Sequence, residues 1–157
     1  MTRGETQAEY FGLTYRVIHR QLNGLTNEES FLQPPFRGNC LNWVLGHIVF
    51  SREAVLTRLG ESFPWTEAEA ARYTRNSEPD TSTGDALPLE RLLTALEASQ
   101  ERIVAGLKRV SDEDLQRPAG DDETIGEQIA FSHWHETYHV GQLELLRQLA
   151  GKNDKVI

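Results

Sequence analysis

The chain has 157 residues, enough for one domain with its own hydrophobic core, and 25% of them are charged, as in an ordinary globular protein. The 24 Asp and Glu residues outnumber the 16 Lys and Arg residues, and the net charge of −8 disfavours binding to the phosphates of nucleic acids. No apolar run approaches the roughly 18 residues of a membrane span and the N-terminus shows no signal-peptide pattern, so we expect a soluble, cytoplasmic protein.

Two helices are expected in the N-terminal half. The first carries apolar side chains at alternating four- and three-residue steps, as a bundle helix does: Phe11, Tyr15, Ile18, Leu22 and Leu25. The second follows Asn39, a favourable N-cap residue, and ends at Gly60. It is apolar on most sides, so we expect it to lie deep in the fold. Cys40 is the only cysteine, which excludes an internal disulfide, and we expect it to be a small buried hydrophobic residue rather than a nucleophile.

A long connection separates these two helices from the next ones. Residues 60–86 are rich in Pro, Ser, Thr and Asp, and they outnumber the residues that bundle connections usually need. We therefore expect a crossover between the second and third helices, with one helical turn around Glu67–Arg72.

Two further helices are expected in the C-terminal half. The third begins near Pro88, because proline suits a first helical turn. The fourth begins at Thr124, which can form a capping box with Glu127, and runs to about Ala150. No segment alternates convincingly between polar and apolar residues, so the predicted fold class is all-α, with a single domain over residues 1–157.

The C-terminal helix carries two histidines at the spacing of a metal site. His135 and His139 are four residues apart, so on a helix their side chains lie one turn apart, with about 5–6 Å between Cβ atoms. Two imidazole nitrogens at that separation can bind one ion at about 2.0–2.1 Å each. A rotation of about 100° per residue places both on a face shared with Phe131 and Leu143, which we expect to point into the bundle. It places His133 near the opposite, exposed side.

A third imidazole is available from the second helix. His47 lies in the most apolar helix of the chain and is the natural third ligand. His19, beside the apolar seam of the first helix, is interpreted as a flanking residue. The alternative to a metal site is a cluster of buried, hydrogen-bonded imidazoles. Two histidines at metal-binding spacing, with a third available, favour the metal.

Three metal-site architectures contain an HExxH string, and the sequence distinguishes among them. A zincin would use Glu136 as general base and needs a further ligand downstream, yet no histidine follows His139. The longer metzincin motif would not place its glycine at Gly141. A di-iron bundle requires Glu-x-x-His on two helices, and the chain has one copy. The remaining architecture is a mononuclear site of three neutral imidazoles with open positions for water or substrate.

Four other residues near these histidines are weaker candidates. Gln142 shares the face of the two C-terminal histidines, so it either orients a ligand or substrate or packs as an amide. Glu136 lies about 100° around the helix from the nearest histidine, and we expect it to orient a ligand or to face solvent rather than to act as a base. Trp43 and Ser51 fall one turn either side of His47 and are candidates for the pocket lining, although Trp43 is favoured as a core residue.

The motifs around these histidines resemble those of a known family. The string His135-Glu-x-x-His139-x-Gly141-Gln142 is similar to the C-terminal signature of the DinB-like superfamily of bacterial bundle proteins. The string Asn42-Trp43-x-x-Gly46-His47 resembles the second-helix motif that supplies the first metal ligand in that family. The similarity extends over essentially the whole chain.

The resemblance carries expectations for fold, cofactor and activity. It implies a four-helix bundle with up-down-down-up topology, a metal site formed by His47, His135 and His139, and a homodimer. It allows zinc, nickel, manganese or iron as the ion. Relatives in the family include thiol-dependent S-transferases and an isomerase, in which the metal activates the thiolate of a low-molecular-weight thiol.

Two enzymatic hypotheses and one non-catalytic hypothesis follow. The first is metal-assisted transfer involving a small thiol, because a divalent ion favours the nucleophilic thiolate form of sulfur. The second is metal-dependent hydrolysis of a small substrate, which would use the same site with water as the nucleophile. The third is a metal-stabilised binding or dimerisation protein without turnover. A site open to solvent would favour catalysis, and a sealed site would favour a structural role.

Overall fold

The computed structural model describes residues 1–78, 86–120 and 122–157 of the chain. Four long helices dominate it: α1 (Arg3–Leu22), α2 (Leu41–Arg58), α4 (Leu89–Arg109) and α6 (Ile125–Leu149). Three short elements connect them: the 3-10 helix η1 (Glu29–Phe31), α3 (Glu67–Ala71) and α5 (Asp112–Leu115). The described residues contain one isolated β-bridge, between Pro118 and Thr124, and no β-strand, which confirms the all-α class.

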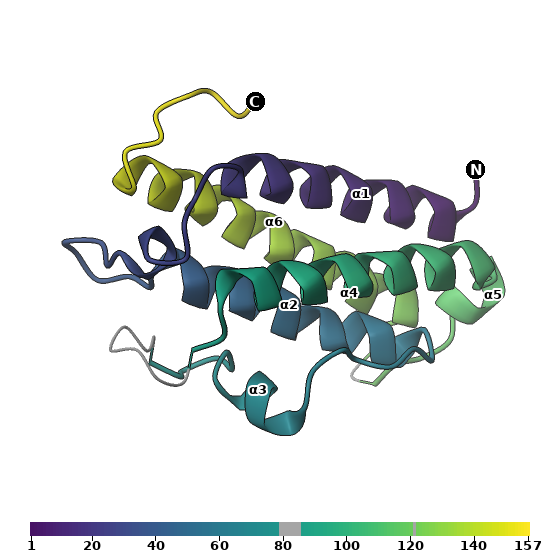
Figure 1. Ribbon diagram of the computed structural model, residues 1–157. Helices are drawn as coiled ribbons and strands as arrows, with labels where there is room; N and C mark the ends of the chain where they lie inside the picture. The colour runs from purple at the N-terminus through teal and green to yellow at the C-terminus, as the bar shows by residue number, and fades with distance from the viewer. Residues whose placement is uncertain (79–85, 121) are drawn as a thin grey trace.

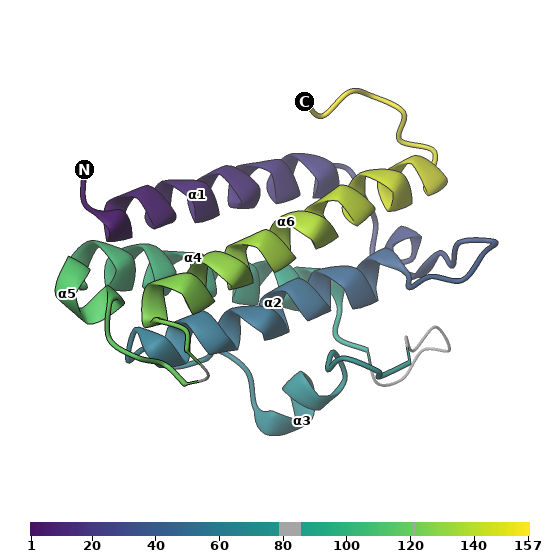
Figure 2. The ribbon, with the colours of Figure 1, turned by 180° about the vertical axis from the view of Figure 1, so that it is seen from behind.

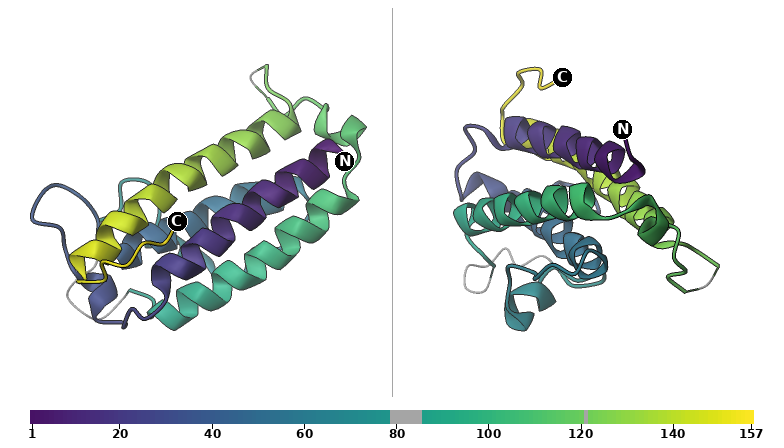
Figure 3. Two further views of the ribbon diagram at one scale, coloured as in Figure 1. Left: turned by 90° about the horizontal axis from the view of Figure 1, so that it is seen from above. Right: turned by 90° about the vertical axis from the view of Figure 1, so that its right-hand side faces the viewer.

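The four long helices pack as a bundle. Helices α1 and α2 each pack against both α4 and α6, so α1 and α2 lie on opposite corners. In Figure 1, α1 and α6 run in one direction along the bundle and α2 and α4 run in the other. Seen from above, their axes lie at small angles to one another (Figure 3). In the described part of the chain, none of the helices combines the length and apolarity that a bilayer span requires.

Capping residues set the helix starts, with one difference from the expectation. Thr124 and Glu127 form the predicted capping box at the start of α6. The expected N-cap of α2, Asn39, is wrong by one residue, because Cys40 occupies that position and makes no side-chain capping bond. The Cys40 side chain is buried in the apolar core instead. Its burial therefore outweighs the preference for a polar N-cap.

The predicted helical turn in the crossover is present as α3, which packs below α2 in Figure 1. A capping box of Thr66 and Glu69 starts it, and Arg91 of α4 binds the same glutamate carboxylate at 2.9 Å. Part of the crossover, residues 79–85, lies outside the described residues. The described part of the crossover therefore contains a short helix that an ion pair ties to α4.

The hydrophobic core consists of two clusters. One is built around the first half of α2 and the second half of α6, and the other around the second half of α2 and the start of α6. A layer of buried polar side chains lies between them along the helices: Thr14 of α1, Arg52 of α2, Ser99 of α4 and Glu136 of α6. Each long helix contributes one residue, so the polar layer sets the register of all four.

Candidate metal centre

Three histidines from two helices, α2 and α6, come together. Figure 2 shows these two helices side by side. His47 projects from α2, and His135 and His139 project from consecutive turns of α6. Each offers one ring nitrogen, and these three atoms all lie within 4.8 Å of one another. The Nε2 atoms of His135 and His139 are 3.2 Å apart.

Hydrogen bonds on the outer side of two imidazoles fix their orientation. His47 Nδ1 lies 2.7 Å from the backbone oxygen of Tyr73, and His139 Nδ1 lies 2.8 Å from Oε1 of Gln142. A carbonyl oxygen only accepts, so each Nδ1 must carry the proton and donate it. The Nε2 atoms of both rings are then unprotonated in the neutral form. Metal-binding histidines are oriented by the same kind of bond on the ring nitrogen away from the ion.

The geometry of the cluster fits a divalent ion. Two nitrogens that each bind one ion at about 2.05 Å in tetrahedral geometry lie about 3.3 Å apart, and the Nε2 atoms of His135 and His139 are 3.2 Å apart. Within the described residues, the cluster contains three imidazoles and no carboxylate or thiol. Three protein ligands leave a coordination position for water or substrate, as in catalytic zinc sites.

All three imidazoles are held in the neutral state that binds metals. Burial lowers the pKa of His47, although its bond to Tyr73 acts in the opposite direction. Burial also lowers the pKa of His135, with the neighbouring His47 as the second cause. For His139, burial lowers the pKa to about 4. Near neutral pH the three rings are therefore uncharged, and no imidazolium proton has to be lost before an ion binds.

Of the three clustered histidines, His135 is the most exposed. His47 and His139 are 6% and 8% exposed, whereas His135 is half-buried and reaches the surface. The ring of Trp43 stacks on His47 with 4.9 Å between centroids. On the other side, the exposed ring of Tyr138 lies 5.1 Å from His139. An aromatic ring therefore packs against the cluster at His47 and another at His139.

Residues close to His47 on α2 bind the crossover. Asn42 accepts a hydrogen bond from the Tyr73 hydroxyl at 3.1 Å and donates one to the backbone oxygen of Leu87 at 2.8 Å. The Tyr73 ring lies directly over Gly46, where any Cβ atom would collide with it. The glycine is therefore required for the close approach that brings the Tyr73 carbonyl to His47.

Trp43 also connects the cluster to a small cavity. Its indole Nε1 donates to Ser77 Oγ at 2.9 Å, and its side chain lines a cavity of about 240 Å³ together with Cys40 and residues of the crossover. The expectation that Trp43 is a core residue is thus confirmed, whereas the cavity that it lines includes none of the three clustered histidines. Ser51, the other lining candidate, is half-buried on α2 and is not among the residues that line this cavity.

Glu136 is placed differently from the expectation. We expected it to orient a ligand or to face solvent, but it is 2% exposed and forms a two-bond ion pair with Arg52, at 2.8 and 2.9 Å. Thr14 donates to the same carboxylate. Arg52 uses its remaining donors on Ser99 and the backbone oxygen of Leu96. The Glu136 carboxylate is thus fully engaged in the core and is not available as a general base.

Two further expectations for α6 were wrong because the buried face is rotated. Phe131 was expected to point into the bundle, but it is 61% exposed. His133 was expected to be exposed, but it is half-buried, with its ring against those of Tyr10 and Phe11 of α1. The buried face is instead centred near Glu136 and Leu143. The histidines therefore lie at the edge of this face, which explains why His135 reaches solvent.

Sequence reasoning missed two residues that support the cluster. Arg52 was hidden within an apolar helix, and only its charge in that context could have marked it as a buried ion-pair partner. Tyr73 lies in the crossover, 26 residues from His47, and no local pattern links the two. His19 does not join the cluster; it is exposed and packs on Tyr15, as expected for a flanking residue.

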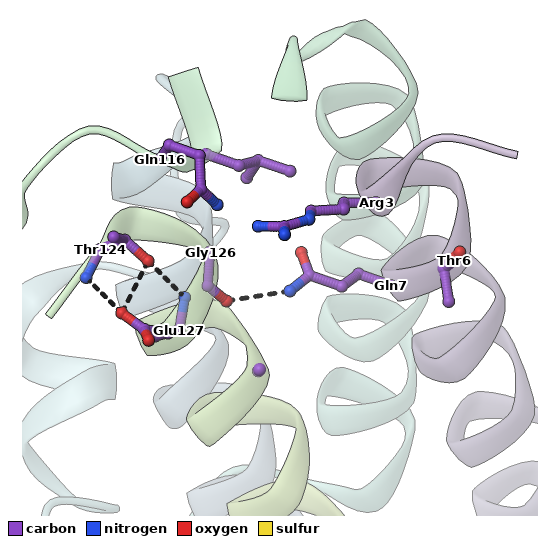
Figure 4. A pocket seen from close by; sticks show the side chains of 9 residues that line it. Arg3, Thr6, Gln7, Gln116, Thr124, Gly126 and Glu127 are labelled. Atoms are coloured by element: carbon purple, nitrogen blue, oxygen red, sulfur yellow. Dashed lines mark hydrogen bonds between the residues drawn. The ribbon is translucent and has the colours of Figure 1, made fainter. Parts of the chain in front are cut away.

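A larger cavity lies away from the histidines, at the end of the bundle where α1 and α6 begin (Figure 4). It has a volume of about 450 Å³, and Arg3, Gln7 and Gln116 point toward it. Gln7 donates to the backbone oxygen of Gly126 at 2.9 Å, and the nearby capping box serves the start of α6. This cavity contains none of the clustered histidines and is separate from the candidate metal centre.

Comparison with known proteins agrees with this architecture. The sequence profile of the DinB superfamily matches residues 10–143, a range that includes all three clustered histidines and both helices that carry them. A comparison with curated proteins gives no match. Because the profile covers most of the chain, and the bundle and histidine motifs lie within the matched range, the chain belongs to the DinB superfamily.

Proposed function

We propose that this chain is a divalent-metal-dependent enzyme in which His47, His135 and His139 bind one ion. The observation that supports this most directly is the convergence of three neutral imidazoles with no other ligand in the cluster. The inward Nε2 atoms of His135 and His139 lie 3.2 Å apart, so in the metal-free protein one ring can donate a hydrogen bond to the other. An ion that both nitrogens bind would take the place of this hydrogen bond.

The proposed activity is a transfer reaction that uses a small thiol. A divalent ion bound by the three imidazoles supplies positive charge that favours the thiolate form of the thiol sulfur. The protein's own contribution is positional. The Tyr73 carbonyl and Gln142 hold two of the rings in place, and the buried Arg52–Glu136 pair fixes α6 against α2. His135 is half-buried, so a substrate reaches the centre on the side of this residue.

The surroundings of His135 support a small substrate with an anionic group. The exposed Arg75 of the crossover is near enough to His135 to contribute to the lowering of its pKa. The exposed ring of Tyr138 offers apolar surface beside His139. The net charge of −8 disfavours nucleic-acid substrates, and a single buried cysteine suits the reducing cytoplasm.

Imidazole ligands suit zinc, nickel and iron. Manganese also binds at sites that combine imidazole with oxygen ligands. The ion must therefore be identified by experiment. The experiment is elemental analysis of protein purified without a metal-affinity tag. We expect about one equivalent of a divalent metal in the wild type and its loss in His139→Ala. His133→Ala is the matched control, because it removes a half-buried histidine from the same helix outside the cluster.

Activity is then measured on the loaded protein. Conjugation of low-molecular-weight thiols to electrophilic acceptors is compared with hydrolysis of small esters and amides. Thiol conjugation that depends on the metal and is lost in His139→Ala supports the transferase. Metal-dependent hydrolysis without thiol conjugation would favour the hydrolase hypothesis instead. Bound metal with neither activity would favour the hypothesis of a non-catalytic, metal-stabilised protein. Protein that neither contains metal nor can be reloaded would refute the metal site.

A further inference from the structure

The cavity at the end of the bundle where α1 and α6 begin has the size of a small-molecule site. Its volume is about 450 Å³, and sites that bind small molecules typically measure about 300–1,000 Å³. Residues of α1, α5 and α6, together with one cap residue of each of the last two helices, form its lining. None of the clustered histidines is among them. A molecule bound here would therefore be independent of the metal centre.

Gln7 of α1 presents a hydrogen-bond acceptor that nothing in the described chain uses. Its side-chain nitrogen Nε2 donates to the backbone oxygen of Gly126 at 2.9 Å. A carbonyl oxygen only accepts hydrogen bonds, so the nitrogen must face Gly126 and the side-chain oxygen Oε1 must point away from it. Figure 4 shows this oxygen on the side of Arg3. Oε1 is buried and has no hydrogen-bond partner among the described residues, so a donor from a bound molecule would satisfy it.

Arg3 brings a positive charge to the same cavity. Its side chain extends from the start of α1 into the space between the labelled residues of Figure 4. Within residues 1–78, 86–120 and 122–157 its guanidinium forms no hydrogen bond or ion pair, and Asp112 binds its backbone N–H instead, at 3.0 Å. Glu127 contributes a carboxylate to the lining, but this group accepts hydrogen bonds from the backbone N–H and the hydroxyl of Thr124, both at 2.8 Å. The Arg3 guanidinium can therefore bind an acidic group of a ligand.

The rest of the lining combines one further amide with apolar surface. The Gln116 side chain points into the cavity from the side opposite Arg3 (Figure 4), and its amide offers both a donor and an acceptor. Leu115, which is buried, and Ala130 add apolar atoms. A few polar groups that converge beside an apolar lining are typical of sites that bind and orient a small molecule.

We propose that this cavity binds a small carboxylate that also carries an N–H or O–H donor and a short apolar group. Arg3 donates to the carboxylate, and such charge-assisted hydrogen bonds are stronger than those between neutral groups. Oε1 of Gln7 accepts a hydrogen bond from the donor, and the apolar group packs against Leu115 and Ala130. N-acylated amino acids have all three features. This site lies outside the three-histidine cluster, so it adds to the proposed metal-dependent activity and does not depend on it.

The test is a titration of the isotope-labelled, full-length protein, followed by the NMR chemical shifts of its backbone amides. The probe is N-acetylleucine, which has a carboxylate, an N–H and an apolar side chain. We expect saturable shifts at Gly126 and Ala130, with a dissociation constant of about 1 mM or lower. N-acetylleucinamide lacks the charge of the carboxylate, and isocaproate lacks the N–H. Each of these two analogues should bind at least about tenfold more weakly than the probe.

Two substitutions assign the recognition to individual side chains. Arg3→Ala should remove the preference for N-acetylleucine over N-acetylleucinamide, and Gln7→Met should remove the preference for N-acetylleucine over isocaproate. A merely structural role of either residue would weaken the binding of all three compounds alike. Arg16→Ala is the matched control, because Arg16 is an exposed arginine of the same helix that does not line the cavity. It should leave each dissociation constant within about twofold of the wild-type value.

A further variant separates this site from the metal centre. His139→Ala should bind N-acetylleucine as the wild type does, so that a failure of the metal site leaves this result intact. The proposal is overturned if the probe causes no shift at the lining residues up to about 10 mM, or shifts only the residues around the clustered histidines. Equal binding of N-acetylleucine and N-acetylleucinamide, or an Arg3→Ala variant that keeps the preference, overturns the assignment of a carboxylate to Arg3.

Discussion

Two buried polar clusters lie on α2 and α6, and they differ in how completely their polar atoms are satisfied. In the first, the Arg52 guanidinium and the Glu136 carboxylate pair through two bonds, and Ser99, Thr14 and a backbone oxygen complete the set. In the second, His47 and His139 are held from outside by Tyr73 and Gln142, while the inward Nε2 atoms of His135 and His139 contact each other at 3.2 Å.

This difference separates a structural cluster from a candidate metal site. A saturated network has no capacity to bind anything further, and its worth lies in fixing the positions of the helices. A cluster whose ring nitrogens point inward can bind a further group at these nitrogens. HExxH strings in general suggest a catalytic glutamate, but here the Glu136 carboxylate belongs to the first cluster and the two histidines to the second. Adjacent positions in the sequence thus serve different purposes.

The largest effect should come from breaking the saturated cluster. Glu136→Ala leaves the Arg52 guanidinium buried without a partner, and we expect the free energy of unfolding to fall by about 3–5 kcal/mol. Urea denaturation measures it. The double variant Arg52→Met with Glu136→Leu is the control, because it removes both charges together and should lose much less. A single variant that loses under 1 kcal/mol, or a double variant as unstable as the single, contradicts this interpretation.

The unsaturated cluster should make the metal-free protein sensitive to acid. The folded-state pKa of His139 is about 4, below its ordinary value of 6.5, so the unfolded chain takes up a proton first as the pH falls. The free energy of unfolding should therefore be constant above about pH 7 and fall by up to about 3 kcal/mol as the pH approaches 4. Denaturation in chelator at several pH values measures this. His139→Gln should show a shallower slope; an unchanged slope would assign the effect to other groups.

A third prediction concerns the support between the crossover and the cluster. Gly46→Ala inserts a Cβ atom into the Tyr73 ring, so we expect a loss of about 2 kcal/mol in unfolding free energy and weaker metal binding. Thermal denaturation and metal titration measure the two effects. Gly12→Ala in α1 is the control, because only the flexible end of Arg16 is near and the change favours the helix. Equal destabilisation by both substitutions would show that the Tyr73 ring does not require a glycine at Gly46.

The smallest effect on stability is expected within the histidine cluster itself. His135 is half-buried, so His135→Gln should change the unfolding free energy of the metal-free protein by less than about 1 kcal/mol. Metal at about 100 times its dissociation constant should stabilise the wild type by about 2.7 kcal/mol, and the variant should lack most of this gain. Thermal shift with and without metal measures both quantities. A variant that keeps the gain would exclude His135 as a ligand.

Local patterns in the sequence were sufficient for the helices and for the pair on α6. The capping box at Thr124, the turn within the crossover and the all-α class depend on interactions between residues a few positions apart. The spacing of His135 and His139 is of the same kind, because four residues make about one helical turn. The bond from His139 to Gln142 also lies within one turn, so the expectation that Gln142 orients a ligand had a local basis.

The remaining features depend on contacts that no local pattern contains. Helical periodicity shows which side chains share a face, but not how far that face is rotated toward the neighbouring helices. This is why Phe131 was assigned to the interior and Glu136 to an orienting or exposed role. The partner of Glu136 is 84 residues away on α2, and the carbonyl that orients His47 is 26 residues away in the crossover.

The sequence by itself determined the helices, their capped ends and the spacing of two histidines, because each results from interactions within one or two turns of the chain. Only the tertiary structure decided that His47 joins them, that Glu136 pairs with Arg52 instead of facing the cluster, and that a row of aromatic residues on α6 faces outward. These outcomes depend on how four helices rotate and cross when they bury their apolar faces together.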